Sequence, residues 1–230
     1  MIYLSGVTND TIEPRLIESG VGLMVQPGNG YAVRVERYEH WAADNGCFAA
    51  KWEEDSWLEW LSRLPTTALF AVSPDVYPNA EESLKRGLKF SGLLRGMGFR
   101  VAIVAQDGAE RLSWPWDEMD CLFLGGKMGK PEWKTSVCAE RLVHEARNAG
   151  KWVHMGRVNS VKRLARAKQM GCLSADGTIL KYGANLHVPW LTKAAQQSDA
   201  QGSLWQHESP SAYPEAWQYG RQQIKVVAIK

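Results

Sequence analysis

Three observations predict an α/β fold, a (β/α)8-type barrel with an irregular or incompletely closed last strand. Short apolar runs alternate with longer segments of helical periodicity, a pattern typical of parallel sheets. Nearly every apolar run ends in a polar or glycine-rich cluster, and a barrel brings all such strand ends to one rim, whereas an open sheet brings only a few together. The chain has 230 residues, about the length of one such domain. We therefore expect a TIM barrel.

Seven apolar runs are the predicted strands, and four segments with apolar residues three and four positions apart are the predicted helices. The strands are residues 21–25, 41–43, 68–72, 101–105, 121–124, 152–155 and 173–175, and the helices are residues 56–64, 80–96, 132–149 and 160–170. Glycines follow three of the helices, as is common at helix ends. Asn79 and either Asn159 or Ser160 are suited to cap the helices that follow them.

The pattern fades after about Pro189, which suggests two parts to the chain. Residues 1–192 are predicted to form the barrel catalytic domain, and residues 193–230 a mobile loop and a C-terminal segment that packs on the barrel. Residues 193–211 are rich in Gln, Ser, Asp and His, as linkers often are. The apolar run 224–229 is a candidate strand that closes the barrel or pairs with residues 1–4.

The composition excludes several classes of protein. A net charge of +2 does not by itself indicate nucleic-acid binding. The apolar runs are far shorter than the roughly 20 residues of a membrane span, and the N-terminus lacks the features of a signal peptide. We expect a cytoplasmic protein, in the host cytoplasm if a phage encodes it. The four cysteines, Cys47, Cys121, Cys138 and Cys172, show no zinc-site spacing, so no metal or cofactor is expected.

Two aspartates at strand ends are the candidate catalytic residues. Asp44 precedes Asn45-Gly46 and is a candidate general base, although Asp-Asn-Gly is also a common tight turn. Asp176 ends an apolar run and is a candidate nucleophile, although Asp-Gly is also a hairpin signal. Two acids on one rim provide the nucleophile and the proton shuttle that substitution at a sugar carbon requires.

Further polar residues at strand ends are candidate substrate-binding groups. Asp75 and Gln106 offer a carboxylate and an amide suited to the edge of a heterocycle, and loop capping is the alternative. A glycine pair after the fifth apolar run can present backbone N–H groups. Three residues in and just after the sixth run could hold a phosphate or ribose. A histidine within a strand is, however, more often a core residue. These further candidates are Gly125, Gly126, His154, Arg157 and Asn159.

Five motifs in shared order resemble those of the tRNA-guanine transglycosylases, most closely their small phage-type relatives that insert 7-deazaguanines into DNA. The resemblance spans about residues 41–189, and the motifs are ADNGCF (43–48), PDVYP (74–78), VAQDG (104–108), LGG (124–126) and VHMGRVN (153–159). It implies a barrel in which Asp176 attacks the ribose and holds a covalent sugar intermediate, with Asp44 as the proton-transferring partner. Asp75, Gln106 and the Gly125 and Gly126 amides would recognise the base.

The resemblance implies exchange of guanine for a 7-deazaguanine, and the polymer is expected to be DNA rather than tRNA. The cysteine triplet and histidine of the tRNA enzymes' zinc subdomain are not found in the sequence. Basic residues at 127, 130 and 134 and at 162, 163, 166 and 168 could contact phosphates, or form solvated helix faces. Trp114, Trp116 or Trp133 could stack on a base. A nucleoside or nucleotide N-glycoside hydrolase and a non-catalytic nucleic-acid-binding barrel are the alternatives; the sequence sets no oligomeric state.

Overall fold

The chain forms a closed barrel of eight parallel strands in sequence order, shown in a computed structural model that describes residues 1–48, 52–127, 129 and 132–200. The strands are β1 Ile2–Ser5, β2 Gly22–Val25, β3 Trp41–Ala43, β4 Ala71–Val72, β5 Val101–Ala105, β6 Cys121–Leu124, β7 Trp152–Met155 and β8 Ser174–Gly177. Each strand pairs with the next, and β1 also pairs with β8. The predicted TIM barrel is confirmed.

The barrel closes regularly, so the expected irregular or incomplete closure is wrong. Four consecutive positions of β1 pair with β8, from Ile2 with Ser174 to Ser5 with Gly177. The N-terminal segment is therefore the strand that joins the two ends of the sheet, because it has strand partners on both sides. The run 224–229, the other candidate for closure, lies outside the described residues.

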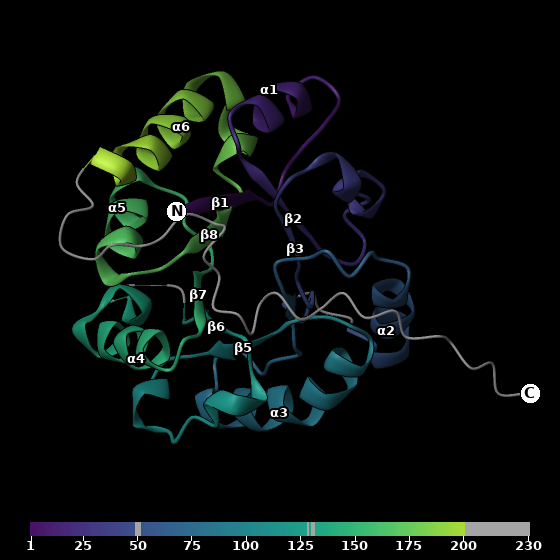
Figure 1. Ribbon diagram of the computed structural model, residues 1–230, viewed down its shortest axis with the longest axis vertical. Coiled ribbons are helices and arrows are strands. Elements are labelled where there is room, and N and C mark those ends of the chain that lie inside the picture. The colour runs from purple at the N-terminus through teal and green to yellow at the C-terminus, as the bar shows by residue number, and fades with distance from the viewer. Residues whose placement is uncertain (49–51, 128, 130–131, 201–230) are drawn as a thin grey trace, which may run out of the picture.

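Helices surround the strands when the molecule is viewed along the barrel (Figure 1). They are α1 Glu13–Glu18, α2 Glu54–Ser62, α3 Ala80–Gly96, α4 Val137–Asn148, α5 Val161–Met170 and α6 Ala184–Ala200. Short 3-10 helices occupy Ala32–Arg37, Ala109–Arg111, Trp116–Glu118, Trp133–Thr135 and Ile179–Tyr182. The 17 residues of α3 match the predicted helix, and Asn79 caps it by accepting a hydrogen bond from the Glu82 N–H.

Several predicted boundaries differ from the structure, and the two largest differences have local reasons. The helix predicted from residue 132 begins instead at Val137, because the Ser136 side chain caps it by accepting from the Ala139 N–H. At the other end of the chain, α6 runs to Ala200 and so crosses the predicted domain boundary at residue 193. Alanine and glutamine are good helix formers, which explains why a polar segment continues a helix. Residues 201–230 lie outside the described part of the chain.

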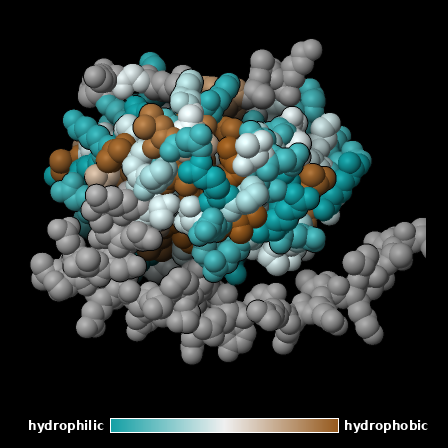
Figure 2. Space-filling view, turned by 90° about the horizontal axis from the view of Figure 1, so that it is seen from above, coloured by the Kyte–Doolittle hydropathy of each residue, from teal (hydrophilic) through white to brown (hydrophobic). Residues whose placement is uncertain are grey.

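Side chains alternate between the inside of the barrel and the helices, as they must on a strand. One apolar cluster fills the barrel interior and includes Leu4, Met24, Phe70 and Val104. A larger cluster lies between the strands and the surrounding helices. On the side of the molecule seen in Figure 2, apolar residues lie in small groups among hydrophilic ones. No helix among the described residues is long and apolar enough to span a membrane.

Candidate functional site

A solvent-open cavity lies at the ends of strands β3 to β8, where barrel enzymes place their catalytic groups. Its volume is about 100 Å³. Six residues singled out in the sequence line it: Asp44, Asp75, Gln106, Gly125, Arg157 and Asp176. The two candidate catalytic aspartates therefore face one cavity although 132 positions separate them in the chain. The closed barrel brings them together because Asp44 follows β3 and Asp176 lies in the last part of β8, at the same end of the sheet.

Asp44 follows β3 directly, and its carboxyl lies near the carboxylates of Asp75 and Asp176. The pKa of its carboxyl is raised to about 7, first by burial and then by the charges of Asp176 and Asp75, against hydrogen bonds from two backbone N–H groups that lower it. The turn predicted at this point also exists, since the Asn45 side chain accepts from the Cys47 N–H and Gly46 has a φ of 68°. Asp44 can thus both give and take a proton near neutral pH.

Asp75 is held by side-chain amides from two neighbouring strand ends. Its Oδ1 accepts from Asn45 Nδ2 at 3.0 Å and its Oδ2 accepts from Gln106 Nε2 at 2.7 Å. Burial raises the pKa of Asp75, while these two amides lower it. Gln106 is itself fixed, because its Oε1 accepts from the Gly126 N–H at 2.9 Å. Asp75 and Gln106, which were predicted to bind the edge of a heterocycle, are therefore held in fixed positions by hydrogen bonds to each other and to their neighbours.

The backbone N–H groups of Gly125 and Gly126 are not available to a ligand, contrary to the role that the resemblance implies for them. The Gly125 N–H donates to the Ala105 carbonyl in the sheet, and the Gly126 N–H donates to Gln106. Gly125 is needed for space, since a Cβ there would lie 2.9 Å from Val104 and 3.2 Å from Gln106 Nε2. These glycines shape the wall of the cavity and orient Gln106.

Asp176 lies within β8, so the hairpin considered for Asp176-Gly177 is not formed. Its Oδ1 is 3.0 Å from His154 Nε2 and accepts from the Arg157 N–H at 3.3 Å. Gly177 is required by close packing, because a Cβ there would lie 2.4 Å from the Tyr3 hydroxyl and 2.5 Å from Asn159 Oδ1. The strand pairing with β1 fixes the backbone of Asp176, and the two donors fix its carboxylate.

His154 and Asn159 do not line the cavity, although both were candidate substrate-binding residues. His154 is fully buried inside the barrel, between the rings of Phe70 and Phe123. The Asn159 side chain accepts from the Thr178 N–H at 2.7 Å and so connects the loop after β7 to β8. A phosphate or ribose bound in the cavity would not reach either side chain directly, because each already serves the strand ends.

Arg157 is the cationic residue of the cavity wall, and its backbone is in the left-handed region with a φ of 57°. One guanidinium nitrogen contacts the carbonyls of Gly125 and Gly126, while Nη1 is buried and has no hydrogen-bond partner among the described residues. A non-glycine residue in this conformation stores strain, and such residues cluster at functional sites. Arg157 thus brings a positive charge to the cavity wall.

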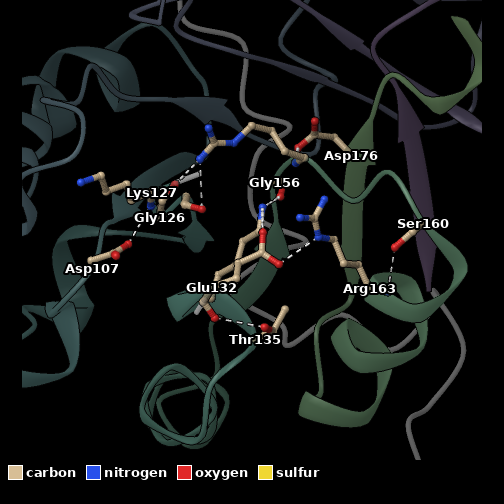
Figure 3. A network of polar contacts seen from close by, with 12 residues as sticks. Asp107, Gly126, Lys127, Glu132, Thr135, Gly156, Ser160, Arg163 and Asp176 are labelled. Carbon is tan, nitrogen blue, oxygen red and sulfur yellow. Dashed lines mark hydrogen bonds and ion pairs between the residues drawn. The ribbon is translucent and has the colours of Figure 1, made fainter. Parts of the chain in front are cut away.

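Lys134, in the loop after β6, supports the turn before Arg157 by binding Gly156, and both Gly156 and the neighbouring Glu132 are labelled in Figure 3. Lys134 Nζ donates to the Gly156 carbonyl at 2.6 Å and lies 3.5 Å from Glu132. Burial lowers the pKa of Lys134 to about 8. The phosphate contact predicted for Lys134 is therefore wrong, because its ammonium is buried and bonded within the protein.

Two of the other basic residues considered for phosphate contacts have carboxylate partners instead. Lys127 is exposed, and Lys130 lies outside the described residues. On α5, Arg163 pairs with Glu132 and Arg166 pairs with Glu140. These two arginines already have carboxylate partners, which leaves less charge for a phosphate backbone than the sequence indicated.

The aromatic side chains at the cavity were missed by the sequence analysis, which had favoured tryptophans. Trp114 and Trp116 stack on each other with ring centroids 5.7 Å apart, and Trp133 donates to Glu110. Instead, Phe48 and Tyr77 line the cavity, 65% and 36% exposed. Both belong to the motifs ADNGCF and PDVYP, so their place beside Asp44 and Asp75 was the available signal.

Phe48 and Tyr77 contact each other edge to face at 5.3 Å, and the Arg157 guanidinium lies 5.6 Å from each ring. We call these three residues the aromatic mouth. In the part of the chain that the structure describes, no three His, Cys, Asp or Glu side chains are grouped to hold a metal ion. The cavity therefore combines three carboxylates, two side-chain amides, one guanidinium and three aromatic rings, the third ring being that of Phe123.

No family model matches the sequence, and no curated protein matches it. Solved structures share the fold. The Amycolatopsis orientalis BexX/CysO complex has a TM-score of 0.55 at 14% identity over 90% of this chain and 94% of that chain. The YdjI aldolase from Escherichia coli K12 has 0.50 at 12% over 90% and 93%, and Haloferax volcanii malate synthase, in its lead(II) complex, has 0.51 at 10% over 95% and 77%. At these identities the likeness concerns the barrel.

Proposed function

We propose that the protein is a base-exchanging transglycosylase that replaces guanine in nucleic acid, DNA rather than tRNA, with a 7-deazaguanine. The observation that carries this proposal is the placement of Asp44 and Asp176 on one cavity in different environments. Asp44 has a pKa raised to about 7, while Asp176 accepts hydrogen bonds from two donors on one oxygen. Paired acids with separated environments are typical of glycosyl transfer.

The proposed reaction has two displacements at the anomeric carbon. An oxygen of Asp176 bonds to that carbon as the bond to the guanine nitrogen breaks, and protonated Asp44 supplies a proton to the departing base. The incoming 7-deazaguanine then gives a proton to Asp44 as its nitrogen bonds to the sugar and the Asp176 ester bond breaks. The base is exchanged, and the polymer and both aspartates return to their starting states.

The acidic wall of the cavity suits a ligand with several N–H donors. Asp75 keeps lone pairs beyond those that its two amide partners use, and Gln106 is oriented beside it. The Watson–Crick edge of guanine and of 7-deazaguanines carries adjacent N–H donors, which a carboxylate can accept. The same wall disfavours a phosphate, because three carboxylates outnumber the single guanidinium of Arg157. A nucleotide whose base lies inside the cavity and whose phosphate stays outside it would place the N–H donors against the carboxylates and keep the phosphate away from them.

A base within a polymer must leave its stack to reach such a cavity. The aromatic mouth supplies exposed rings on which an extruded or flanking base can stack, and such stacking is sequence-tolerant. A cavity of about 100 Å³ suits one small ring system. These features support a nucleic-acid substrate, and the resemblance in the five motifs supports DNA.

The test is incubation of the full chain with duplex DNA, single-stranded DNA or tRNA and radiolabelled guanine or 7-deazaguanines. We expect label in DNA and a protein–DNA adduct that survives denaturation, both lost in Asp176→Asn and both kept in the matched control Asp117→Asn, an exposed carboxylate in the loop after β5. Release of free base without incorporation would indicate a hydrolase instead. Neither release nor incorporation, with DNA still bound, would leave a binding protein and contradict the proposal.

A further inference from the structure

A chain of polar side chains crosses the otherwise apolar interior of the barrel and ends on Asp176. The Trp152 indole N–H donates to Ser174 Oγ at 2.7 Å, Ser174 Oγ is 2.8 Å from His154 Nδ1, and His154 Nε2 is 3.0 Å from Asp176 Oδ1. His154 and Ser174 are both fully buried. Because side chains alternate along a strand, Ser174 and Asp176 point to the same inner face of β8, and Trp152 and His154 do so on β7.

The chemistry of the first donor sets the direction of the whole chain. An indole nitrogen can only donate, so Ser174 Oγ accepts from Trp152. Among the described residues, the only other hydrogen-bond partner shown for the Ser174 hydroxyl is His154 Nδ1. The hydroxyl proton therefore points to Nδ1, which must be the unprotonated nitrogen, and the imidazole proton is on Nε2. That N–H donates to Asp176.

We infer that His154 is a positioning residue, held by Ser174 and Trp152 as the neutral Nε2–H tautomer, that orients the Asp176 carboxylate for attack on the sugar. This inference rests on the proposed function for the role of Asp176, whereas the tautomer itself does not. His154 contacts no substrate, because it is fully buried and does not line the cavity. It acts through Asp176.

The geometry of Asp176 shows why such a residue is useful. The donors shown for the carboxylate, His154 Nε2 and the Arg157 N–H, both reach Oδ1. The carboxylate also faces the cavity, with its side chain 15% exposed. One oxygen is thus fixed by the protein, while the other, Oδ2, has no hydrogen bond within the described residues. A charge-assisted bond of this kind holds the rotamer of the carboxylate while leaving one oxygen to react.

The first test needs no substrate. Nitrogen-15 NMR of the imidazole in the full chain should show Nε2 protonated and Nδ1 unprotonated in His154, with the Nε2 proton shifted downfield by the carboxylate. Asp176→Asn should move that proton signal upfield, and Ser174→Ala should let the Nδ1–H tautomer appear. A wild-type protein with the proton on Nδ1, or with both nitrogens protonated at neutral pH, would overturn the inference.

The second test compares two replacements of the same side chain. His154→Leu removes the donor, and we expect the rate of adduct formation to fall about 10- to 100-fold with little change in the KM for the incoming base. His154→Gln keeps an N–H near the position of Nε2 and should recover part of that rate. Cys121→Ala, a truncation in the same interior cluster, controls for loss of packing and should leave the rate unchanged.

The outcomes separate the two proposals. If the wild-type protein exchanges bases and both His154 variants react at its rate, the positioning role fails and the proposed function stands. If the wild-type protein exchanges no base on any polymer, the proposed function fails, and the imidazole signals still decide whether the chain from Trp152 to Asp176 has the inferred direction. Should His154→Leu not fold, the spectra of the wild-type protein and of Asp176→Asn decide the inference without it.

Discussion

Two parts of the cavity wall hold a carboxylate in different ways. At the ends of β3, β4 and β5, neutral amides of Asn45 and Gln106 bind both oxygens of Asp75. At β7 and β8, an imidazole and a backbone N–H bind one oxygen of Asp176. The first arrangement fixes a carboxylate completely, as recognition of a ligand requires. The second fixes the rotamer and leaves an oxygen available, as a nucleophile requires.

Asp44 is influenced by both of these carboxylates. The charges of both Asp176 and Asp75 raise its pKa, and burial raises it most, to about 7. The carboxylates of Asp75 and Asp176 therefore have a second effect: together they raise the pKa of Asp44, so that it can transfer protons near neutral pH. If this comparison is correct, the three aspartates should fail in three different ways when the carboxylate is removed.

The largest effect is expected from Asp176→Asn. An amide does not form the ester to the sugar, so base exchange should fall by at least about 10⁴-fold and the denaturation-resistant adduct should disappear. Gel analysis of the adduct and incorporation of labelled base measure this. The exposed control Asp117→Asn should react at the wild-type rate, and an adduct that persists in Asp176→Asn would assign the nucleophile to another residue.

Asp44→Asn should come next, with a loss of about 10²- to 10⁴-fold, because the departing base then lacks its proton donor. The wild-type rate of adduct formation should fall as the pH rises through about 7, since the protonated form is the donor. This pH dependence should be lost in the variant. A single-turnover pH profile measures both effects, and an unchanged profile in Asp44→Asn would remove Asp44 from the proton transfer.

Asp75→Asn should alter recognition more than reaction. An asparagine presents an N–H group where the base requires an acceptor, so we expect KM for the incoming base to rise about 10- to 100-fold with a smaller change in kcat. Steady-state kinetics with guanine and a 7-deazaguanine measure it. A loss confined to kcat would contradict the division of the cavity into a recognition wall and a reaction wall.

Phe48→Ala should weaken binding of the polymer by about 5- to 100-fold, the range expected for one stacked base. The change tests the aromatic mouth, since Phe48 is 65% exposed and carries little of the core. Fluorescence anisotropy with single-stranded DNA measures the affinity. Phe48→Trp is the matched variant and should retain binding, whereas equal affinity of all three proteins would place the polymer elsewhere.

The smallest effect concerns stability. The pKa of Asp44 is raised in the folded protein, so folding binds a proton at intermediate pH and this stabilisation is present below the unfolded pKa near 3.8. It is lost as the pH rises through about 7, where the acidic cavity becomes fully charged. Asp44→Asn should therefore be more stable than wild type at pH 8, by on the order of 1–3 kcal/mol, and should show a flatter dependence on pH. Urea unfolding at pH 5 and pH 8 measures the free energy of unfolding of both proteins. An equal change between the two pH values in wild type and variant would contradict the raised pKa of Asp44.

Much of the fold could be predicted from the sequence because its causes are local. Strands β3, β5, β6 and β7 begin and end where their apolar runs do, and α3 is bounded by its Asn79 cap. The closing strand β1 could not be predicted with its partners, because closure depends on pairing between residues that are far apart in the chain. The extension of α6 to Ala200 was missed because a polar composition indicates a loop as readily as an exposed helix.

The site divides in the same way. Apolar runs and the polar residues at their ends were sufficient to single out the six predicted residues that line the cavity. The sequence did not show that the Gly125 and Gly126 amides are already bonded, that Lys134 is buried, or that His154 faces Asp176 rather than a ligand. Each of those facts depends on a contact across neighbouring strands, and such contacts leave no local pattern.

The sequence by itself determined where β3, β5, β6 and β7 begin and end, because apolar runs and turn chemistry act over a few neighbouring positions. The tertiary structure alone decided which of these residues share a cavity and which oxygen of Asp176 stays free. The physical reason is that burial, charge and hydrogen-bond direction are set by neighbours in space. Closure of the barrel between β1 and β8 supplies those neighbours.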